Sequence, residues 1–203
     1  TSGACGDITR NITGCPLTGI DRNEFINTEP VIERVHRYFL DNREFSNLPR
    51  KFKITISGCP VYCTGHEIND IGLVALNGDN GVVFDLWVGG GLGAKERFGE
   101  RLGVHVTEGE IARVCHHICG IFRDHGNRQS RALARLKFLM ADWGAEKFRN
   151  ELENCLGYKL TPGAAPKVPV SANRAHIGIL AQKQAGLSYV GAATTGGLLS
   201  GEQ

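Results

Sequence analysis

The chain has 203 residues and a net charge of +2, and 41% of its residues are hydrophobic. This composition predicts a globular protein with a sizeable core, and so small a net charge gives no reason to expect nucleic acid as a partner. No apolar run approaches the roughly 18 residues of a membrane-spanning helix, so we expect no membrane partner either. Seven cysteines, an odd number in a chain this long, favour a reducing compartment and hence a cytoplasmic protein.

The first half of the chain predicts one helix and three strands. Residues 1–22 contain several glycines and are expected to form a loop, followed by a helix over about 23–42, where apolar residues recur at helical spacing. Strands are expected at about 52–57, 70–76 and 82–88. The Asn- and Gly-rich segment 77–81 is a strong hairpin signal between the last two strands.

The second half predicts helices and then a linker. Thr107 and Glu110 form a capping box for a helix over about 108–124, and further helices are expected at about 127–142 and 144–155. Residues 161–173 are rich in Pro, Ala and Gly, which predicts a linker. Strand-like residues resume at 177–180 and 187–190.

Two lysines mark the strand at 52–57 as a candidate site. Lys51 and Lys53 are two residues apart, so on a strand both side chains point to the same face. Neighbouring ammonium groups repel each other, and they must therefore be solvated or share an anion. The pattern is compatible with a solvent-exposed strand face and with an anion-binding site.

Arginines supply further candidate cations. Arg10 lies in a glycine-flanked loop, and Arg128, Arg131 and Arg135 recur at spacings of three and four, which would place them in one stripe on the predicted helix 127–142. Such a stripe can bind carboxylates or phosphates through bidentate contacts. It can also be a solvated face or a nucleic-acid patch, but aromatic residues are not interleaved with it.

Cysteines supply candidate metal ligands. Cys59 and Cys63 are separated by three residues, and with Cys5 and Cys15 they could ligate a soft metal or an iron–sulfur cluster. In that case the chain would be an iron–sulfur electron-transfer module. The same spacing also fits a turn with two buried thiols.

Five short runs together resemble the siroheme-dependent sulfite and nitrite reductase family, in the family's order, over roughly residues 1–157. The runs are Gly6-Asp7-x-x-Arg10-Asn11, Leu48-Pro49-Arg50-Lys51-Phe52-Lys53, His66-Glu67-Ile68-Asn69-Asp70, Leu86-Trp87-Val88-Gly89-Gly90-Gly91-Leu92 and Arg123-Asp124-His125-Gly126-Asn127-Arg128. The resemblance implies an α+β fold, a mixed sheet with flanking helices that forms one half of a pseudo-two-fold architecture. It also implies siroheme and a 4Fe–4S cluster as cofactors.

The implied activity is the six-electron reduction of sulfite to sulfide, or alternatively of nitrite to ammonia, with ferredoxin or a flavoprotein as electron donor. Arg10, Lys51 and Lys53 match the family positions that face the small anion substrate. Lys53 favours sulfite, because nitrite reductases of the family often have Asn at this position. The resemblance implies cofactor binding by Asn11, Arg50, His66, Asn69, Gly89, Gly90, Gly91, Arg128, Arg131 and Arg135, with the three glycines letting backbone approach the macrocycle.

The chain departs from the family pattern at its cysteines. The family's cluster ligands form Cys-x5-Cys and Cys-x3-Cys pairs in the second half, so we expect no metal site here and read Cys5, Cys15, Cys59 and Cys63 as a vestige of duplication. The expected plan is a first half at 1–160, a linker at 161–173, and the start of a ferredoxin-like second half at 174–203. The chain would then be the central part of a longer enzyme and inactive alone.

Overall fold

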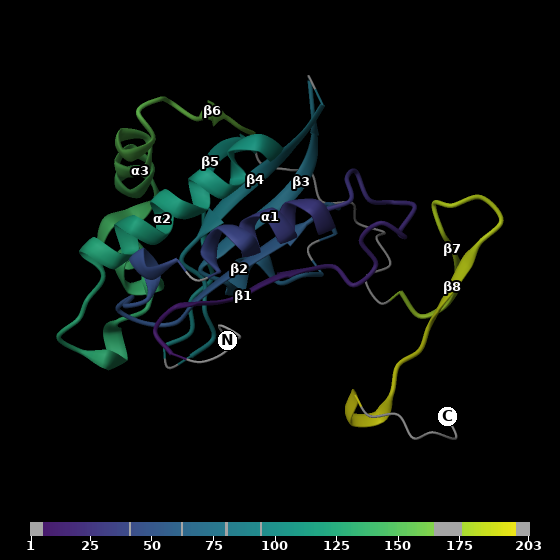
Figure 1. Cartoon of the computed structure of the whole chain (residues 1–203), viewed down its shortest axis with the longest axis horizontal. Helices are drawn as coiled ribbons and strands as arrows, with labels where there is room; N and C mark the ends of the chain where they lie inside the picture. The colour runs from purple at the N-terminus through teal and green to yellow at the C-terminus, as the bar shows by residue number, and fades with distance from the viewer. Residues whose placement is uncertain are drawn as a thin grey trace.

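The computed structural model describes residues 6–40, 42–61, 63–79, 81–93, 95–164 and 176–197. These residues form a six-stranded mixed sheet with helices packed on it and a separate two-stranded hairpin toward the C-terminal end (Figure 1). The predicted α+β class, a mixed sheet with flanking helices, is therefore confirmed. Within the described residues, no helix is both long enough and apolar enough to cross a bilayer.

The strands of the main sheet are arranged in chain order. They are β1 (Thr9–Gly14), β2 (Phe52–Ser57), β3 (Ile71–Gly78), β4 (Gly81–Val88), β5 (Glu100–Thr107) and β6 (Thr161–Pro162). β1 pairs with β2, and β2 with β3, in parallel, whereas the pairs β3–β4, β4–β5 and β5–β6 are antiparallel. Because parallel strands need a crossover, the connection between β1 and β2 contains a helix.

Three helices cover one face of the sheet: α1 (Glu29–Phe39), α2 (Ile111–His125) and α3 (Leu136–Leu156). Figure 1 shows α1 and α2 lying across this face. The core lies between the layers, where Phe52 stacks on Phe122 of α2 with ring centroids 5.6 Å apart. Ile54 and Ile56, at alternate positions of β2, are fully buried in the same core. Consequently the opposite side chains of β2 point to the other face of the sheet.

Several local predictions are confirmed. β2 spans the residues expected, and β3 and β4 form the expected hairpin with Asn77 opposite Val82. The capping box is present, because Thr107 donates its backbone N–H to Glu110 at 2.9 Å at the start of the turn that leads into α2. The helix expected over 23–42 is shorter and begins at Glu29, since Pro30 occupies its first turn.

The predicted helix over 127–142 is wrong. After α2 the side chain of Asn127 accepts hydrogen bonds from the backbone of Gln129 and Ser130 at 2.9 and 3.0 Å, so a turn replaces the helix. α3 starts only at Leu136, and its Gly144 has a φ of 72°, which agrees with the break expected near residue 143. The arginines at 128, 131 and 135 therefore do not form a helical stripe.

Three strands, β1, β5 and β6, were not expected from the sequence. β1 lies within the segment that was predicted to be loop, and β5 lies where no element was predicted. The strand-like segments at 177–180 and 187–190 are confirmed, as β7 (Gly178–Ala181) and β8 (Ser188–Gly191), which pair antiparallel. The linker expected at 161–173 begins with β6, and its residues 165–173 lie outside the described residues. The division into two halves stays a prediction.

Candidate functional site

Lys51 and Lys53 lie on the sheet face opposite the helices. Phe52 and Ile54 alternate with them and are fully buried in the core, whereas both lysines are half-buried. The prediction that the two ammonium groups share a face is therefore confirmed. Among the described residues, no acidic side chain forms an ion pair with either lysine.

A β-bulge in the neighbouring strand places Arg10 beside these lysines. In the parallel pairing of β1 with β2, Thr9 lies opposite Phe52 and Asn11 opposite Lys53, so Arg10 is the extra residue. A bulge of this kind redirects a side chain relative to regular pairing. The Arg10 guanidinium donates to the Gly6 carbonyl at 2.9 Å.

The cations are close enough to influence one another. The pKa of Lys51 is lowered, first by burial and then by the positive charges of Arg135, Lys53, Arg10 and Arg50. Both effects disfavour the ammonium form of Lys51. We refer to Arg10, Arg50, Lys51, Lys53 and Arg135 as the cation cluster. A bound anion would offset this repulsion, so the cluster is suited to an anionic ligand.

Asp70 holds one member of the cation cluster in place. Its fully buried carboxylate accepts two hydrogen bonds from Arg135 Nη2, at 3.0 and 2.9 Å, and one from the backbone N–H of Lys53 at 2.9 Å. Burial raises the pKa of Asp70 to about 6, although Arg135 and Lys53 oppose the shift. No role for Asp70 was predicted from the sequence; its charge directly before the apolar strand β3 was the available signal.

A second carboxylate, Asp7, joins two other arginines of the predicted site. Arg131 Nη1 lies 2.9 Å from an Asp7 oxygen, and Arg50 lies 3.7 Å from the other. Arg128 instead donates to the carbonyls of Asn47 and Arg123, at 2.8 and 3.1 Å. Cofactor binding by these arginines stays a prediction.

The glycines at 89–91 allow the chain to pack closely on itself. A Cβ at Gly89 would lie 2.3 Å from the Met140 side chain, and one at Gly90 would lie 2.1 Å from the Glu67 carbonyl oxygen. Gly91 contacts Arg135, and its carbonyl accepts a hydrogen bond from buried Lys137 at 3.3 Å. Close packing against the protein itself therefore explains why these three positions are glycine. Contact of the three glycines with a macrocycle stays a prediction.

His66 and Asn69 lie beneath this glycine loop. The ring of His66 is 1% exposed and lies edge-on to Trp87 at 4.8 Å, and burial lowers its pKa to about 4. Asn69 donates its side-chain N–H to Gly65, and its own carbonyl accepts the N–H of Gly90, each at 2.8 Å. Both residues support the loop, while their roles toward a cofactor stay predictions.

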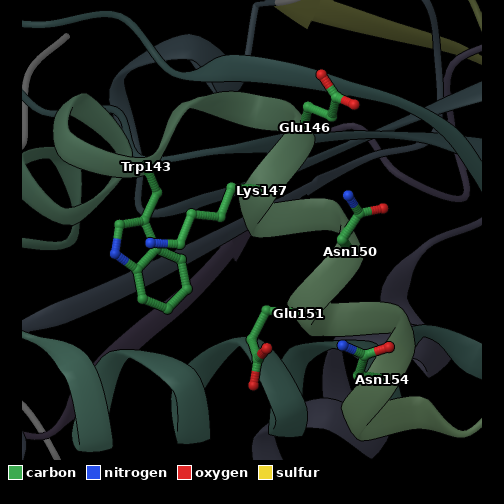
Figure 2. Close-up of a pocket in the computed structure, with 6 residues that line it drawn as sticks. All are labelled: Trp143, Glu146, Lys147, Asn150, Glu151 and Asn154. Atoms are coloured by element: carbon green, nitrogen blue, oxygen red, sulfur yellow. The ribbon is translucent and has the colours of Figure 1, made fainter.

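Within the described residues, no group of three or more His, Cys, Asp or Glu side chains is arranged to hold a metal ion. Cys5 lies outside them, so the alternative cluster with Cys15, Cys59 and Cys63 as further ligands stays a prediction. A hollow beside α3 is lined by Trp143, Glu146, Lys147, Asn150, Glu151 and Asn154 (Figure 2). The ammonium of Lys147 lies 4.6 Å from the centre of the Trp143 ring there. The predicted site residues are not among its lining.

Comparison with known proteins gives the family. Residues 5–160 match the family model described as the nitrite and sulphite reductase 4Fe-4S domain. The chain belongs to this reductase family. The match covers β1 through α3 and therefore the whole cation cluster.

Individual members of the family share much of this chain. It is 42% identical over 203 residues to sulfite reductase [ferredoxin] 1 of Mycolicibacterium paratuberculosis, covering 99% of this chain and 36% of the relative. Ferredoxin–nitrite reductase of Leptolyngbya laminosa is 40% identical over 190 residues, covering 91% of this chain and 37% of the relative. The chain thus spans little more than a third of the length of these curated relatives.

A solved structure supports the fold. The Mycobacterium tuberculosis NirA protein superposes with a TM-score of 0.85 at 40% identity, covering 92% of this chain and 34% of that protein. The reductase family implies a siroheme and a 4Fe–4S cluster. The cation cluster fits siroheme, because that macrocycle carries carboxylates that need positive partners.

Proposed function

We propose that this chain supplies the anion-binding part of a siroheme-dependent reductase, which reduces sulfite to sulfide by six electrons taken from ferredoxin. The observation that carries the proposal is the cation cluster, in which Lys51 and Lys53 share one sheet face beside Arg10. The names of the relatives in the reductase family support both the substrate and the donor. The chain matches only 36% of the length of the sulfite reductase relative, which supports the proposal that it forms part of a longer enzyme.

The chain's own cations would bind and orient the substrate. Arg10, Lys51 and Lys53 converge from two adjacent strands, so they can surround a small oxyanion with charge-assisted hydrogen bonds. The rigid sheet holds them in position before the substrate arrives, and preorganised charges stabilise developing negative charge without reorganisation. Asp70 contributes by fixing Arg135 and the backbone of Lys53.

Lys51 is the best placed proton donor of the cluster. The oxygen atoms of sulfite leave as water, so protons must reach them during the reaction. Burial and the neighbouring cations lower the pKa of Lys51, which makes its proton less costly to release from Nζ.

When bound, siroheme would supply the iron that ligates the anion and delivers electrons to it. The residues proposed to hold the cofactor are Asn11, Arg50, His66, Asn69, Gly89, Gly90, Gly91, Arg128, Arg131 and Arg135. Arg50 and Arg135 belong to the cation cluster, and these two offer charge to the carboxylates of the cofactor. The proposed 4Fe–4S cluster is assigned to ligands in the rest of the longer enzyme.

Nitrite is the second candidate substrate, because nitrite reductases are nearly as similar to this chain as sulfite reductases. The distinction rests on charge. Sulfite can carry two negative charges and nitrite carries one, so a second ammonium group at Lys53 favours sulfite.

The test uses the full-length reductase. After purification with siroheme, it is given sulfite or nitrite with a reduced viologen dye as the electron donor. The proposal predicts a visible spectrum of an isobacteriochlorin and sulfide production well above background. A protein that takes up no siroheme and reduces neither anion would contradict it.

A further inference from the structure

The β4–β5 loop, residues 89–99, closes on itself beside the cation cluster. Gly91 and Arg97 exchange backbone hydrogen bonds, with the Gly91 N–H donating at 2.9 Å and the Arg97 N–H at 3.1 Å. Arg135 of the cation cluster donates to the carbonyl of Gly90 at 3.4 Å, and a Cβ on Gly91 would lie 3.0 Å from its Nη2 atom. The loop and the cation cluster are therefore in direct contact.

Lys137 binds this loop from the protein interior. It is the second residue of α3 and is only 1% exposed. Its ammonium group donates to the carbonyl of Gly91 at 3.3 Å and to the carbonyl of Lys95 at 2.7 Å. Because Gly91 and Lys95 lie four residues apart, one side chain joins two separate points of the loop.

A buried lysine at the start of a helix is costly for the fold. Burial removes the water around its ammonium group, and the positive end of the helix dipole repels cations in the first turn. Arg135, the N-cap of α3, is a second cation at the same end. Lys95 adds backbone strain, since its φ of 58° lies in the left-handed region that favours glycine. An uncharged side chain would fill the space at lower cost, so the hydrogen bonds to the loop are what a lysine provides here.

We propose that Lys137 is a positioning residue of the reductase, which holds the β4–β5 loop in the shape that binds the macrocycle. This inference rests on the proposed function, in which Gly89, Gly90 and Gly91 lie against siroheme. Because Lys137 is buried, it acts through the loop and does not touch the ligand. Loss of its two hydrogen bonds would let the loop move relative to Arg135 and would weaken binding of the macrocycle.

The first test measures the order of the loop by limited digestion of the full-length reductase, prepared without its cofactor. Trypsin cleaves after lysine and arginine, and both Lys95 and Arg97 lie in the loop. Lys137→Met keeps a side chain of similar length and removes both hydrogen bonds. We expect it to speed cleavage after Lys95 and Arg97 about 10-fold, because cleavage follows the population of the opened loop.

Three controls separate loop opening from unfolding. Cleavage after Arg113, in α2, reports global unfolding and should keep its parent rate. Lys147→Met removes an ammonium group from the same helix, beside Trp143 (Figure 2), and should leave cleavage of the loop unchanged. The milder variant Lys137→Gln keeps an N–H donor at shorter reach and should give an intermediate rate, so the test does not depend on one variant.

The second test measures binding of the iron-free siroheme macrocycle to the same cofactor-free proteins by fluorescence titration. We expect Lys137→Met to raise the Kd about 10-fold, because binding must then select the closed loop from a mixed population. Lys147→Met should bind like the parent.

Each contrary result has its own meaning. The inference is overturned if Lys137→Met leaves cleavage of the loop at the parent rate, or speeds cleavage after Arg113 equally. It is also overturned, with the proposed function intact, if the parent and Lys137→Met bind the macrocycle with the same Kd. A parent protein that binds no macrocycle would overturn the proposed function and this inference together.

Discussion

Gly90→Ala is expected to destabilise the protein strongly because its new Cβ has no space. That atom would lie 2.1 Å from the carbonyl oxygen of Glu67, against 3.4 Å or more for an ordinary contact, so the backbone must move by about 1.3 Å. The movement would break the hydrogen bonds from Gly90 to Asn69 and from Gly99 to Glu67, now 2.8 and 2.7 Å long. At about 1 kcal/mol for each bond and about 2 kcal/mol for overpacking, the free energy of unfolding should fall by about 4 kcal/mol.

Urea unfolding of the cofactor-free protein measures this loss. With an m value of about 2 kcal/mol per molar urea, the midpoint should fall by about 2 M. Gly93→Ala is the matched control, because a Cβ at Gly93 meets nothing within 4 Å and should change stability by less than about 0.5 kcal/mol. If the glycines serve a cofactor and not protein packing, Gly90→Ala would unfold at the parent midpoint, which would refute the packing argument.

Three further predictions concern stability. Burial depresses the folded-state pKa of His66 to about 4, so as pH falls from about 6.5 to 4 the parent should lose about 3 kcal/mol relative to His66→Asn, measured by urea unfolding at each pH. An unchanged difference between the two proteins would contradict this. Arg135→Met leaves the Asp70 carboxylate buried and unpaired, and it should cost about 3–5 kcal/mol at pH 7 and less at pH 5, where Asp70 takes up a proton; an equal cost at both pH values would argue against the pair. Thr107→Ala removes a helix cap and should lower the free energy of unfolding, measured by urea unfolding, by about 1 kcal/mol. No change in this free energy would show that the cap contributes nothing to stability.

Local patterns in the sequence predicted the parts of the site that depend on neighbours along the chain. The alternation of β2 placed Lys51 and Lys53 on one face, since side chains on a strand alternate whatever the strand packs against. The capping box and the hairpin were predicted for the same reason. Each depends on a few adjacent residues.

The predictions that failed were missed for two reasons: long-range contacts, and a local turn that competes with a helix. β1 was expected to be loop because of the glycines spread over residues 1–22, yet pairing with β2 makes it a strand and places Arg10 in a bulge. The arginine stripe failed because Asn127 competes for backbone hydrogen bonds, which periodicity does not register. Likewise, the partner of Arg135 is Asp70, 65 residues away in the chain, and spacing alone could not identify it.

The central claim, that the cation cluster binds the anion to be reduced, is tested most directly by Lys53→Asn in the full-length reductase. The measurement is kcat/KM for sulfite and for nitrite, with Lys147→Asn as a charge-matched control at a lysine next to Trp143 on α3. Loss of one charge-assisted contact, worth about 1.5–3 kcal/mol, should reduce kcat/KM for sulfite by a factor between about 10 and about 150. Nitrite turnover should change by less than about threefold, because nitrite carries a single charge. Equal losses for both anions, or no loss for sulfite, would contradict the account.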